Sequence, residues 1–565
     1  MSFKITSLHR KQYGWSFFLS LIVLIPNIYL LFYGSDFEGA SIRKMIAYLG
    51  FSGILFVIPS LFLKARIFFL VMGIFVLAAP IEIAHIFLNR MPSSSAFLLS
   101  IIETNSSEAS ELLGSVKIPL IAYGLLCVFY FVIVFSQIKN EYLISFKKIR
   151  CWLLAVSAFV LLLGYAWQLN LSCQVSASKG DVWGAATYYY SKKFSKTWPY
   201  SLIFQTESLM ATRLEIKKDK EVLQNFYFYA EKAHAIDKKE VYVLVIGETG
   251  RYQNYSINGY ERETSPRLSK TANVVSYSNM YSEANLTSTS MPIILTQADA
   301  QDYTRYYREK SLVDAFQEAG FKTYWIGNQS AGNSFIRRIA TDADGKYFAV
   351  TDFDSAGHYD ENLWLPMEQF LSRGDEKVLI VIHTLGSHFR YNFRYPANFE
   401  VFKPSLQDAF DYALISAKNK ELFVNTYDNS ILYTDYFLAS TIQKIDSLQA
   451  VSALIYLADH GENLFDTEQK LALHAGLVYS KFDFHIPFFV WTSEAYQQQY
   501  PEKAAAIVQN KDKKLSAGHL FNSLLDIADI HFPAQQIDRS IASGSLHEDS
   551  VRYIINTNME VKRID

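Results

Sequence analysis

The sequence predicts a helical membrane domain of five spans, followed by an extracytoplasmic α/β domain with a largely parallel central sheet. Half of the 565 residues are hydrophobic and only 19% are charged, and the apolar excess is concentrated in the first 168 residues. From Val241 onward, short apolar runs alternate with stretches of helical periodicity. Such alternation is typical of a parallel sheet whose strands are buried between helices.

The first 168 residues contain five apolar runs, each long enough to cross a bilayer core, which requires about 20 helical residues. A cleaved signal peptide accounts for one run but not for the four that follow it. We therefore expect a transmembrane domain over residues 1–168, with spans at Trp15–Tyr33, Met45–Leu63, Ile67–Leu88, Ile118–Ser136 and Cys151–Gln168.

Lys and Arg residues gather on one side of these spans. They precede the first span and separate the second from the third and the fourth from the fifth: Arg10, Lys11, Lys64, Arg66, Lys139, Lys147, Lys148 and Arg150. Positive residues mark the cytoplasmic side, so the N-terminus is expected inside. An odd number of spans then places the rest of the chain outside, as an interfacial and helical linker over 169–240 and a globular domain over 241–565.

The overall charge excludes one class of partner. The chain has 53 Lys and Arg against 55 Asp and Glu, a net charge of −2. Nucleic-acid binding needs a strongly basic surface, so this balance offers no electrostatic case for it. Of the three cysteines only Cys173 lies beyond the spans, so no disulfide is expected within the exported domain.

Several candidate metal ligands follow predicted strands of the second domain. The strands are expected at Val241–Gly247, Lys322–Ile326, Val378–His383, Ala453–Ala458 and Ile486–Trp491. Glu248 follows the first strand, Asp459 and His460 follow the fourth, His388 follows the third, and His474 comes later. Sites in α/β folds lie beyond the carboxyl ends of parallel strands, and carboxylates and imidazoles are ligands for zinc or manganese. The sequence therefore predicts a metal site at this sheet edge.

A hydroxyl-rich segment, Asn285–Pro292, precedes a short apolar run and could open a helix. A hydroxyl at a helix N-terminus is well placed to approach an anionic phosphate, and a metal would activate it as a nucleophile. The same residues are also the usual choices for a helix N-cap. The spacing alone leaves both interpretations open.

Five spaced motifs together resemble the bacterial phosphoethanolamine transferases, which belong to the sulfatase and alkaline-phosphatase-like superfamily. The motifs are Ile246-Gly-Glu-Thr-Gly-Arg251, Asn258-Gly-Tyr-Glu-Arg-Glu-Thr-Ser-Pro266, Thr287-Ser-Thr-Ser-Met-Pro292, Tyr427-Asp-Asn429 with Asp435, and Ala458-Asp-His-Gly-Glu462. The resemblance covers nearly the whole chain, because that family also combines five spans, a linker and an exported catalytic domain. It implies a multi-pass protein of the bacterial inner membrane with its catalytic domain in the periplasm.

The resemblance also implies roles for individual residues. Thr287 matches the nucleophile, and Glu248, Asp459 and His460 match the residues that hold zinc beside it. His388 and His474 match histidines that bind the transferred phosphate or a second zinc, so one or two zinc ions are implied. Further substrate contacts are implied for His383, for Asn328, and for Thr104 and Glu108 in the outer loop Glu103–Glu108.

The implied reaction transfers phosphoethanolamine from phosphatidylethanolamine to an envelope acceptor through a phospho-threonine intermediate. The acceptor stays open among lipid A, the lipopolysaccharide core and other glycans, since the disulfides common in lipid A-modifying members cannot form here. Alternatives are a phosphoglycerol transferase of the same superfamily, a phosphohydrolase, a sulfatase or a non-catalytic membrane sensor. The Cys-x-Pro-x-Arg pattern of sulfatases is missing around Thr287.

Overall fold

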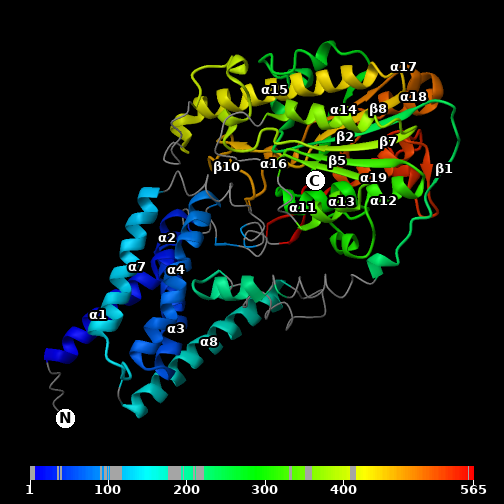
Figure 1. Cartoon of the computed structure of the whole chain (residues 1–565). Coiled ribbons are helices and arrows are strands. Elements are labelled where there is room, and N and C mark those ends of the chain that lie inside the picture. The colour runs from blue at the N-terminus through cyan, green and yellow to red at the C-terminus, as the bar shows by residue number, and fades with distance from the viewer. Residues whose placement is uncertain are drawn as a thin grey trace. The chain divides into compact units, whose positions relative to one another are not determined.

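The computed structural model describes two compact units of the chain (Figure 1). The first comprises Met1–Leu98 with Val116–Ala211, and the second comprises Leu99–Ser115 with Thr212–Asp565. The described residues are 7–34, 37, 41–89, 92–93, 98, 101, 117–144, 146–175, 193–194, 196–207, 210, 222–329, 334–349, 359–406, 415–476, 478–557 and 559–565. The predicted lipid-loop residues Thr104 and Glu108 lie outside them.

The first unit is helical. Its helices are α1 (Ser7–Val23), α2 (Ile25–Tyr33), α3 (Ile42–Phe62), α4 (Ala65–Asn89), α7 (Lys117–Gln137) and α8 (Lys147–Val175). Within the described residues, four helices are long and apolar enough to span a membrane, and α1 with α2 makes a fifth if this pair, bent by 49°, crosses as one span. Pro26 lies in the first turn of α2, where its missing N–H breaks the helical hydrogen-bond ladder.

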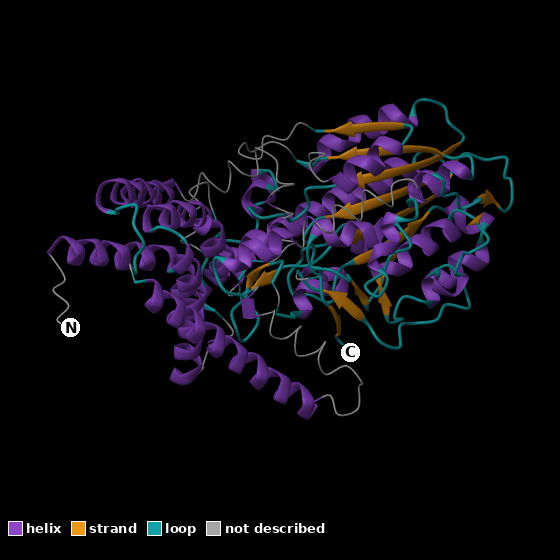
Figure 2. Cartoon of the chain, turned by 90° about the horizontal axis from the view of Figure 1, so that it is seen from below, coloured by secondary structure: helices purple, strands orange, loops and turns teal. Residues whose placement is uncertain are grey.

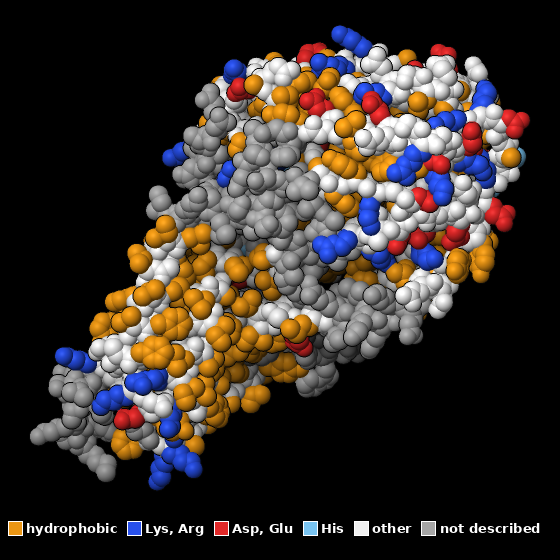
Figure 3. All heavy atoms as spheres, viewed as in Figure 1, with side chains coloured by type: hydrophobic (Ala, Val, Ile, Leu, Met, Phe, Trp, Pro, Cys, Tyr) orange, Lys and Arg blue, Asp and Glu red, His pale blue; other side chains and the backbone are white. Residues whose placement is uncertain are grey.

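The surface of the first unit suits a lipid environment. Figure 3 shows apolar side chains over most of its visible face, whereas Lys, Arg, Asp and Glu are scattered over the second unit. The most exposed large apolar residues of this unit include Phe17, Phe32, Ile74, Leu125 and Leu162, all more than half exposed. So much exposed apolar surface is characteristic of contact with a membrane.

Hydrogen bonds from tyrosines join α4 to α7 inside this unit. The hydroxyl of Tyr130 donates to the carbonyl of Phe69 at 2.7 Å, and that of Tyr123 donates to Val76 at 2.8 Å. Trp198, in the linker predicted to be interfacial, is only 2% exposed. Its carbonyl accepts from Nδ2 of Asn27 at 2.7 Å, and its N–H donates to Oδ1 of Asn27 at 2.9 Å. These hydrogen bonds hold the segment after α8 against α2.

The second unit is built on a mixed sheet (Figure 2). In the described part of the chain the strand order is β3-β11-β8-β2-β7-β5-β6. The strands from β8 to β6 pair in parallel, and β11 pairs antiparallel with β8 and β3. Their bounds are β2 (Glu240–Gly247), β3 (Val274–Ser276), β5 (Lys322–Gly327), β6 (Gly345–Phe348), β7 (Lys377–His383), β8 (Val451–Ala458) and β11 (Phe488–Thr492). The predicted largely parallel sheet is confirmed.

Helices cover both faces of this sheet (Figure 1). Along β2, Val241, Val243 and Val245 pack into one apolar cluster, and the residues between them pack into another. This alternation follows from the two-residue period of a strand. The first cluster lies under α14 (Trp364–Leu371) and α15 (Lys420–Asp446), and the second under α11 (Thr287–Leu295), α12 (Leu312–Glu318), α13 (Ser334–Asp342) and α19 (Leu520–Ile527).

Short elements complete the second unit. Its remaining helices are α16 (Lys481–Phe484), α17 (Glu494–Gln499) and α18 (Pro501–Gln509). Four short strand pairs are β1 (Glu231–Lys232) with β13 (Ile530–His531), β4 (Met280–Tyr281) with β12 (Leu515–Ser516), β9 (Asn463–Leu464) with β10 (Ala472–Leu473), and β14 (Tyr553–Ile555) with β15 (Val561–Arg563), as far as the described residues show.

The linker expected to be interfacial and helical over 169–240 is not helical over residues 226–239. These residues are not helical, and two of them form β1. Phe228 is 4% exposed and packs against Phe521 and Phe532, whereas Tyr227 is 56% exposed. The aromatic residues thus alternate between core and solvent, which favours a non-helical chain over the helix that the charge content suggested.

Candidate active site

Three adjacent parallel strands bring the predicted site residues to one sheet edge. Glu248 directly follows β2, Asp459 and His460 directly follow β8, and His388 lies five residues beyond β7. Because β8, β2 and β7 are neighbours with the same direction, their carboxyl ends meet. This is the position in which α/β folds place their sites.

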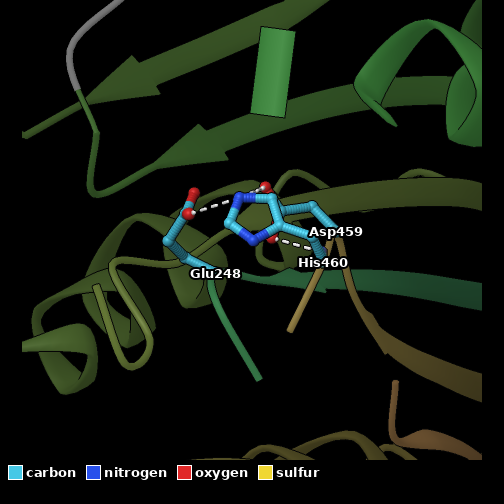
Figure 4. A group of neighbouring side chains, drawn as sticks. All are labelled: Glu248, Asp459 and His460. Carbon is cyan, nitrogen blue, oxygen red and sulfur yellow. Dashed lines mark hydrogen bonds and ion pairs between the residues drawn. The ribbon is translucent and has the colours of Figure 1, made fainter. Parts of the chain in front are cut away.

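Glu248, Asp459 and His460 form a group that can hold a metal ion (Figure 4). Each offers one ligand atom, and these atoms lie within 4.8 Å of one another. Nε2 of His460 is 3.4 Å from Oε1 of Glu248 and 3.4 Å from Oδ2 of Asp459. Oδ2 of Asp459 is buried and accepts no hydrogen bond of normal geometry within the described residues. Two buried carboxylates and an imidazole fit a divalent ion such as zinc.

Hydrogen bonds orient these three side chains. The Nδ1–H of His460 donates to the carbonyl of Gly461 at 2.9 Å, which directs Nε2 toward the carboxylates. Oδ1 of Asp459 accepts the N–H groups of Thr249 at 3.1 Å and His460 at 2.8 Å. Oε2 of Glu248 accepts from Nε2 of Gln329 at 3.0 Å. Such partners fix the geometry of a metal ligand.

The electrostatics of the group favour a cation. Burial acts to raise the pKa of Glu248, but the nearby His460, His388 and His474 together hold it below its usual range. Burial, and then the charge of Glu248, raise the pKa of Asp459. One carboxylate therefore keeps its charge at the expense of the other, a conflict that a bound cation removes.

Thr287 is the first residue of α11, and its hydroxyl faces this group. Oγ1 lies 3.2 and 3.3 Å from the two carboxylate oxygens of Glu248 and 3.3 Å from Nε2 of His460. The N-cap position belongs to Leu286, and no side chain caps the helix. The hydroxyl of Thr287 is thus directed to the metal group at a helix N-terminus, where a phosphate would be attracted.

His388 and His474 present neutral imidazoles beside the group. Burial lowers the pKa of His388 to about 4 and that of His474 to about 3. Nδ1 of His388 donates to the carbonyl of Phe389 at 2.6 Å, and Nδ1 of His474 lies 3.4 Å from Oε2 of Glu462. Each imidazole therefore keeps its Nε2 lone pair as a proton or metal acceptor.

Asn328 and His383, for which substrate contacts are predicted, are buried. Asn328 is fully buried and donates from Nδ2 to Asp360 at 2.8 Å, and its backbone N–H bonds to the carbonyl of His383. His383 is the last residue of β7, 1% exposed, with its ring edge-on to Trp325. The structure brings neither side chain into the metal group.

Sequence reasoning missed several residues of the site. Gln329 follows β5 at the same sheet edge, so the rule that located Glu248 could have found it. Glu462 ends the Ala458–Glu462 motif, but roles were predicted only for Asp459 and His460 of that motif. Thr249 and Tyr427 stand in two of the quoted motifs, but the sequence implied no role for either, because their roles depend on contacts across the fold.

Comparisons with known proteins agree with this geometry. The sulfatase family model matches residues 240–530. Phosphoethanolamine transferase EptC of Escherichia coli (strain K12) is 28% identical over 506 residues, which cover 84% of this chain and 81% of that protein. The solved C-terminal periplasmic domain of E. coli EptC in complex with Zn is 29% identical with a TM-score of 0.53, covering 60% of this chain and 94% of that one.

A solved integral membrane protein shares the fold of most of the chain. Lipooligosaccharide phosphoethanolamine transferase A (EptA) of Neisseria meningitidis matches with a TM-score of 0.66 over 84% of this chain and 90% of that one. Its identity is 23%, so the likeness concerns the fold alone. The predicted fold class, apolar helices followed by an α/β domain, is confirmed.

Proposed function

The chain belongs to the sulfatase family, and we propose that it transfers phosphoethanolamine from phosphatidylethanolamine to a lipid or glycan acceptor of the bacterial envelope. The resemblance to phosphoethanolamine transferases indicated by the motifs is confirmed by the relatives, as is the assignment to an enzyme class. One observation carries the proposal: the hydroxyl of Thr287 opens α11 within 3.3 Å of both Glu248 and His460.

The residues that would hold a metal ion are Glu248, Asp459, His460 and the hydroxyl oxygen of Thr287. A zinc complex of a relative's domain supports zinc as this ion. Zinc supplies Lewis acidity when bound, lowering the pKa of the hydroxyl and offsetting negative charge on phosphoryl oxygens. His388 and His474 are candidates to contact the phosphate or to hold a second ion.

In the first step, Oγ1 of Thr287 attacks the phosphorus of the donor lipid. The bond from phosphorus to the glycerol oxygen breaks, diacylglycerol leaves, and phosphoethanolamine is bonded to Thr287. The threonine proton passes to a neutral imidazole, His388 or His474, which returns a proton to the leaving oxygen. In the second step an acceptor hydroxyl or protonated phosphate oxygen attacks phosphorus and gives its proton to the imidazole, which passes it to the Thr287 oxygen as the bond from phosphorus to Thr287 breaks.

The helical unit fits a lipid donor. Helices able to span a bilayer would keep the catalytic unit at the surface where phosphatidylethanolamine is found. In this proposal the protein is a multi-pass inner-membrane protein with a cytoplasmic N-terminus and a periplasmic catalytic unit. The loop with Thr104 and Glu108 is proposed to contact the donor's head group.

Mass spectrometry of envelope lipids and glycans tests the proposed reaction. Cells that express the intact protein should gain a phosphoethanolamine addition, and cells with Thr287→Ala should not. Thr287→Ser keeps a hydroxyl and should retain part of the addition. Ser288→Ala is the matched control, because its hydroxyl makes no hydrogen bond within the described residues.

The same spectra identify the outcomes that contradict the proposal. A phosphoethanolamine addition that persists in Thr287→Ala would exclude Thr287 as the nucleophile. A glycerophosphate addition would instead assign the chain to the phosphoglycerol transferases. Free phosphoethanolamine without a modified acceptor would make it a hydrolase.

A further inference from the structure

The turn that carries Glu248 has a strained backbone. Thr249 follows Glu248 directly and has φ of 59°, in the left-handed region. A β-branched residue rarely adopts this conformation, which is strained and persists only where surrounding contacts enforce it. The strain therefore requires an explanation in the contacts of this turn.

Every polar group of Thr249 is hydrogen-bonded. Its N–H donates to Oδ1 of Asp459 at 3.1 Å, and its hydroxyl donates to Oε1 of Glu248 at 2.8 Å. Its carbonyl accepts from the hydroxyl of Tyr427 at 2.7 Å. The first two contacts are made with members of the metal group itself. The hydrogen bond from Tyr427 is therefore the one contact of these three that stabilises the backbone of Thr249 from outside the metal group.

The hydroxyl of Tyr427 forms hydrogen bonds with the backbone of the turn on both sides of Gly250. Besides donating to the carbonyl of Thr249, its hydroxyl accepts the backbone N–H of Arg251 at 2.9 Å. The side chain is fully buried in α15, and its ring contacts Tyr391 edge-on at 5.2 Å. A rigid helix thus holds two backbone groups of the turn through one oxygen that has no alternative solvent partner.

Arg251 extends this contact to the loop after β8. Its guanidinium is 2.7 Å from Oδ2 of Asp466, and Asp466 also pairs with Lys420 in the first turn of α15 at 2.7 Å. The guanidinium stacks over the ring of Phe482 at 4.3 Å. The helix that carries Tyr427 therefore joins both chain segments that supply the metal group.

We propose that Tyr427 is a positioning residue that locks the Glu248–Arg251 turn in its strained form and so pre-organises the metal group before an ion binds. The inference rests on the proposed metal-dependent function. It assigns a role to the Tyr427-Asp-Asn429 motif that the nucleophile and the ligands leave unexplained. Without the hydroxyl, the carbonyl of Thr249 and the N–H of Arg251 lose a buried partner, and the turn can relax away from Asp459.

The experiment compares Tyr427→Phe with Tyr433→Phe in the purified full chain. Both tyrosines belong to α15, both are at most 1% exposed, and the hydroxyl of Tyr433 accepts a backbone N–H from Glu361 at 3.2 Å. Each change therefore removes one buried hydroxyl from the same helix, but only the first touches the Glu248 turn. Zinc affinity is measured by competition with a chelator, and stability by the thermal midpoint without zinc.

We expect both variants to lose stability, but only Tyr427→Phe to bind zinc about 10–100-fold more weakly, the usual effect of removing an outer-shell partner. Equal zinc affinity of the two variants would overturn the inference. Failure of the unmodified chain to bind zinc would instead contradict the proposed function. The two failures are therefore distinguishable.

Hydrogen exchange on the unmodified chain gives a second test that does not depend on a variant folding. A pre-organised turn should protect the Arg251 amide equally in the zinc-free and zinc-loaded protein. Rapid exchange at Arg251 that becomes slow only after zinc addition would show that the ion, rather than Tyr427, orders the turn, and would overturn the inference.

Discussion

Glu283 is a buried carboxylate outside the metal group. It is 4% exposed, and its two oxygens accept the backbone N–H groups of Ala300 at 2.6 Å and Gly518 at 3.0 Å. Burial raises the pKa of Glu283 to about 7. Because burial favours the neutral form, the folded chain holds a proton here under conditions in which the unfolded chain releases it.

This buried acid predicts a loss of stability as the pH rises. The pKa of Glu283 increases from 4.5 to about 7 on folding, so between these pH values the folded state binds more protons and the free energy of unfolding falls. The full decrease is about 3 kcal/mol. The thermal midpoint of the full chain should therefore fall more steeply from pH 4.5 to 7.5 than that of Glu283→Gln, which cannot titrate.

Glu468→Gln serves as the control, because Glu468 is exposed and its removal should leave the slope unchanged. Only the difference in slope between the unmodified chain and each variant is compared, since other groups of the fold also titrate. Parallel curves for the unmodified chain and Glu283→Gln would contradict the expected role of this carboxylate.

At the scale of elements, α15 organises several loops of the second unit. Asp428 accepts from Asn254, Tyr260 and Arg262. The amide oxygen of Asn429 accepts two backbone N–H groups, of Val401 and Phe402. Asp428 thus holds three side chains of the Asn254–Arg262 segment, and Asn429 supplies an acceptor for two backbone N–H groups that would otherwise lack a partner.

Asp435 provides a prediction that separates this structural role from that of Tyr427. Its carboxylate accepts the N–H groups of Arg267 at 3.0 Å and Leu268 at 2.8 Å. Asp435→Asn replaces one acceptor by an NH2 group, so we expect a loss of about 1–3 kcal/mol in stability. Zinc affinity should change less than twofold, since these loops do not carry the metal group.

The thermal midpoint and chelator competition measure both quantities, with Asp446→Asn, an exposed position at the end of the same helix, as the control. A tenfold loss of zinc affinity in Asp435→Asn would mean that α15 acts on the site as a rigid body, and not through the hydroxyl of Tyr427 alone.

The elements that the sequence predicted are those with a local apolar signature. β2 and β8, buried at every position, begin within two residues of the expected runs, because strands of a parallel sheet are continuously apolar. β3 and β6 are partly exposed, and they have no such run. Residues placed by strand ends, such as Glu248 and Asp459, were therefore predictable.

The contacts that hold the site residues in position could not be predicted in the same way. The bond from Tyr427 to Thr249 joins residues 178 positions apart. The left-handed φ of Thr249 contradicts the preference of its residue type. Local sequence patterns indicate neither this hydrogen bond nor this φ angle, since both depend on how α15 packs across β2. The sequence thus locates the reactive groups, whereas the structure is needed to explain what holds them in place.

At the scale of the whole molecule, the two units have separate cores. Buried apolar residues such as Phe68, Phe69 and Tyr130 belong to a cluster of the helical unit, and the clusters on the two faces of the sheet belong to the second unit. A periplasmic domain of the relative EptC has been solved on its own. Both observations favour independent folding of the second unit.

Residues 212–565 expressed alone should therefore bind zinc as tightly as the full chain, yet fail to use a donor embedded in a bilayer. The metal group, Thr287 and Tyr427 all lie within these residues, whereas every helix long and apolar enough to span a membrane, among those described, lies outside them. Because the proposed donor is a lipid, the isolated unit should lose activity only toward donor molecules that are embedded in a bilayer.

Two donors distinguish this loss from general damage. With phosphatidylethanolamine vesicles, release of diacylglycerol by the isolated unit should fall at least tenfold relative to the full chain. With a short-chain, water-soluble phosphoethanolamine ester the two proteins should differ less than threefold, because the catalytic residues are shared. Equal activity on vesicles would show that the helical unit is not needed to reach the donor. Equal loss on both donors would show that it contributes to the catalytic site itself.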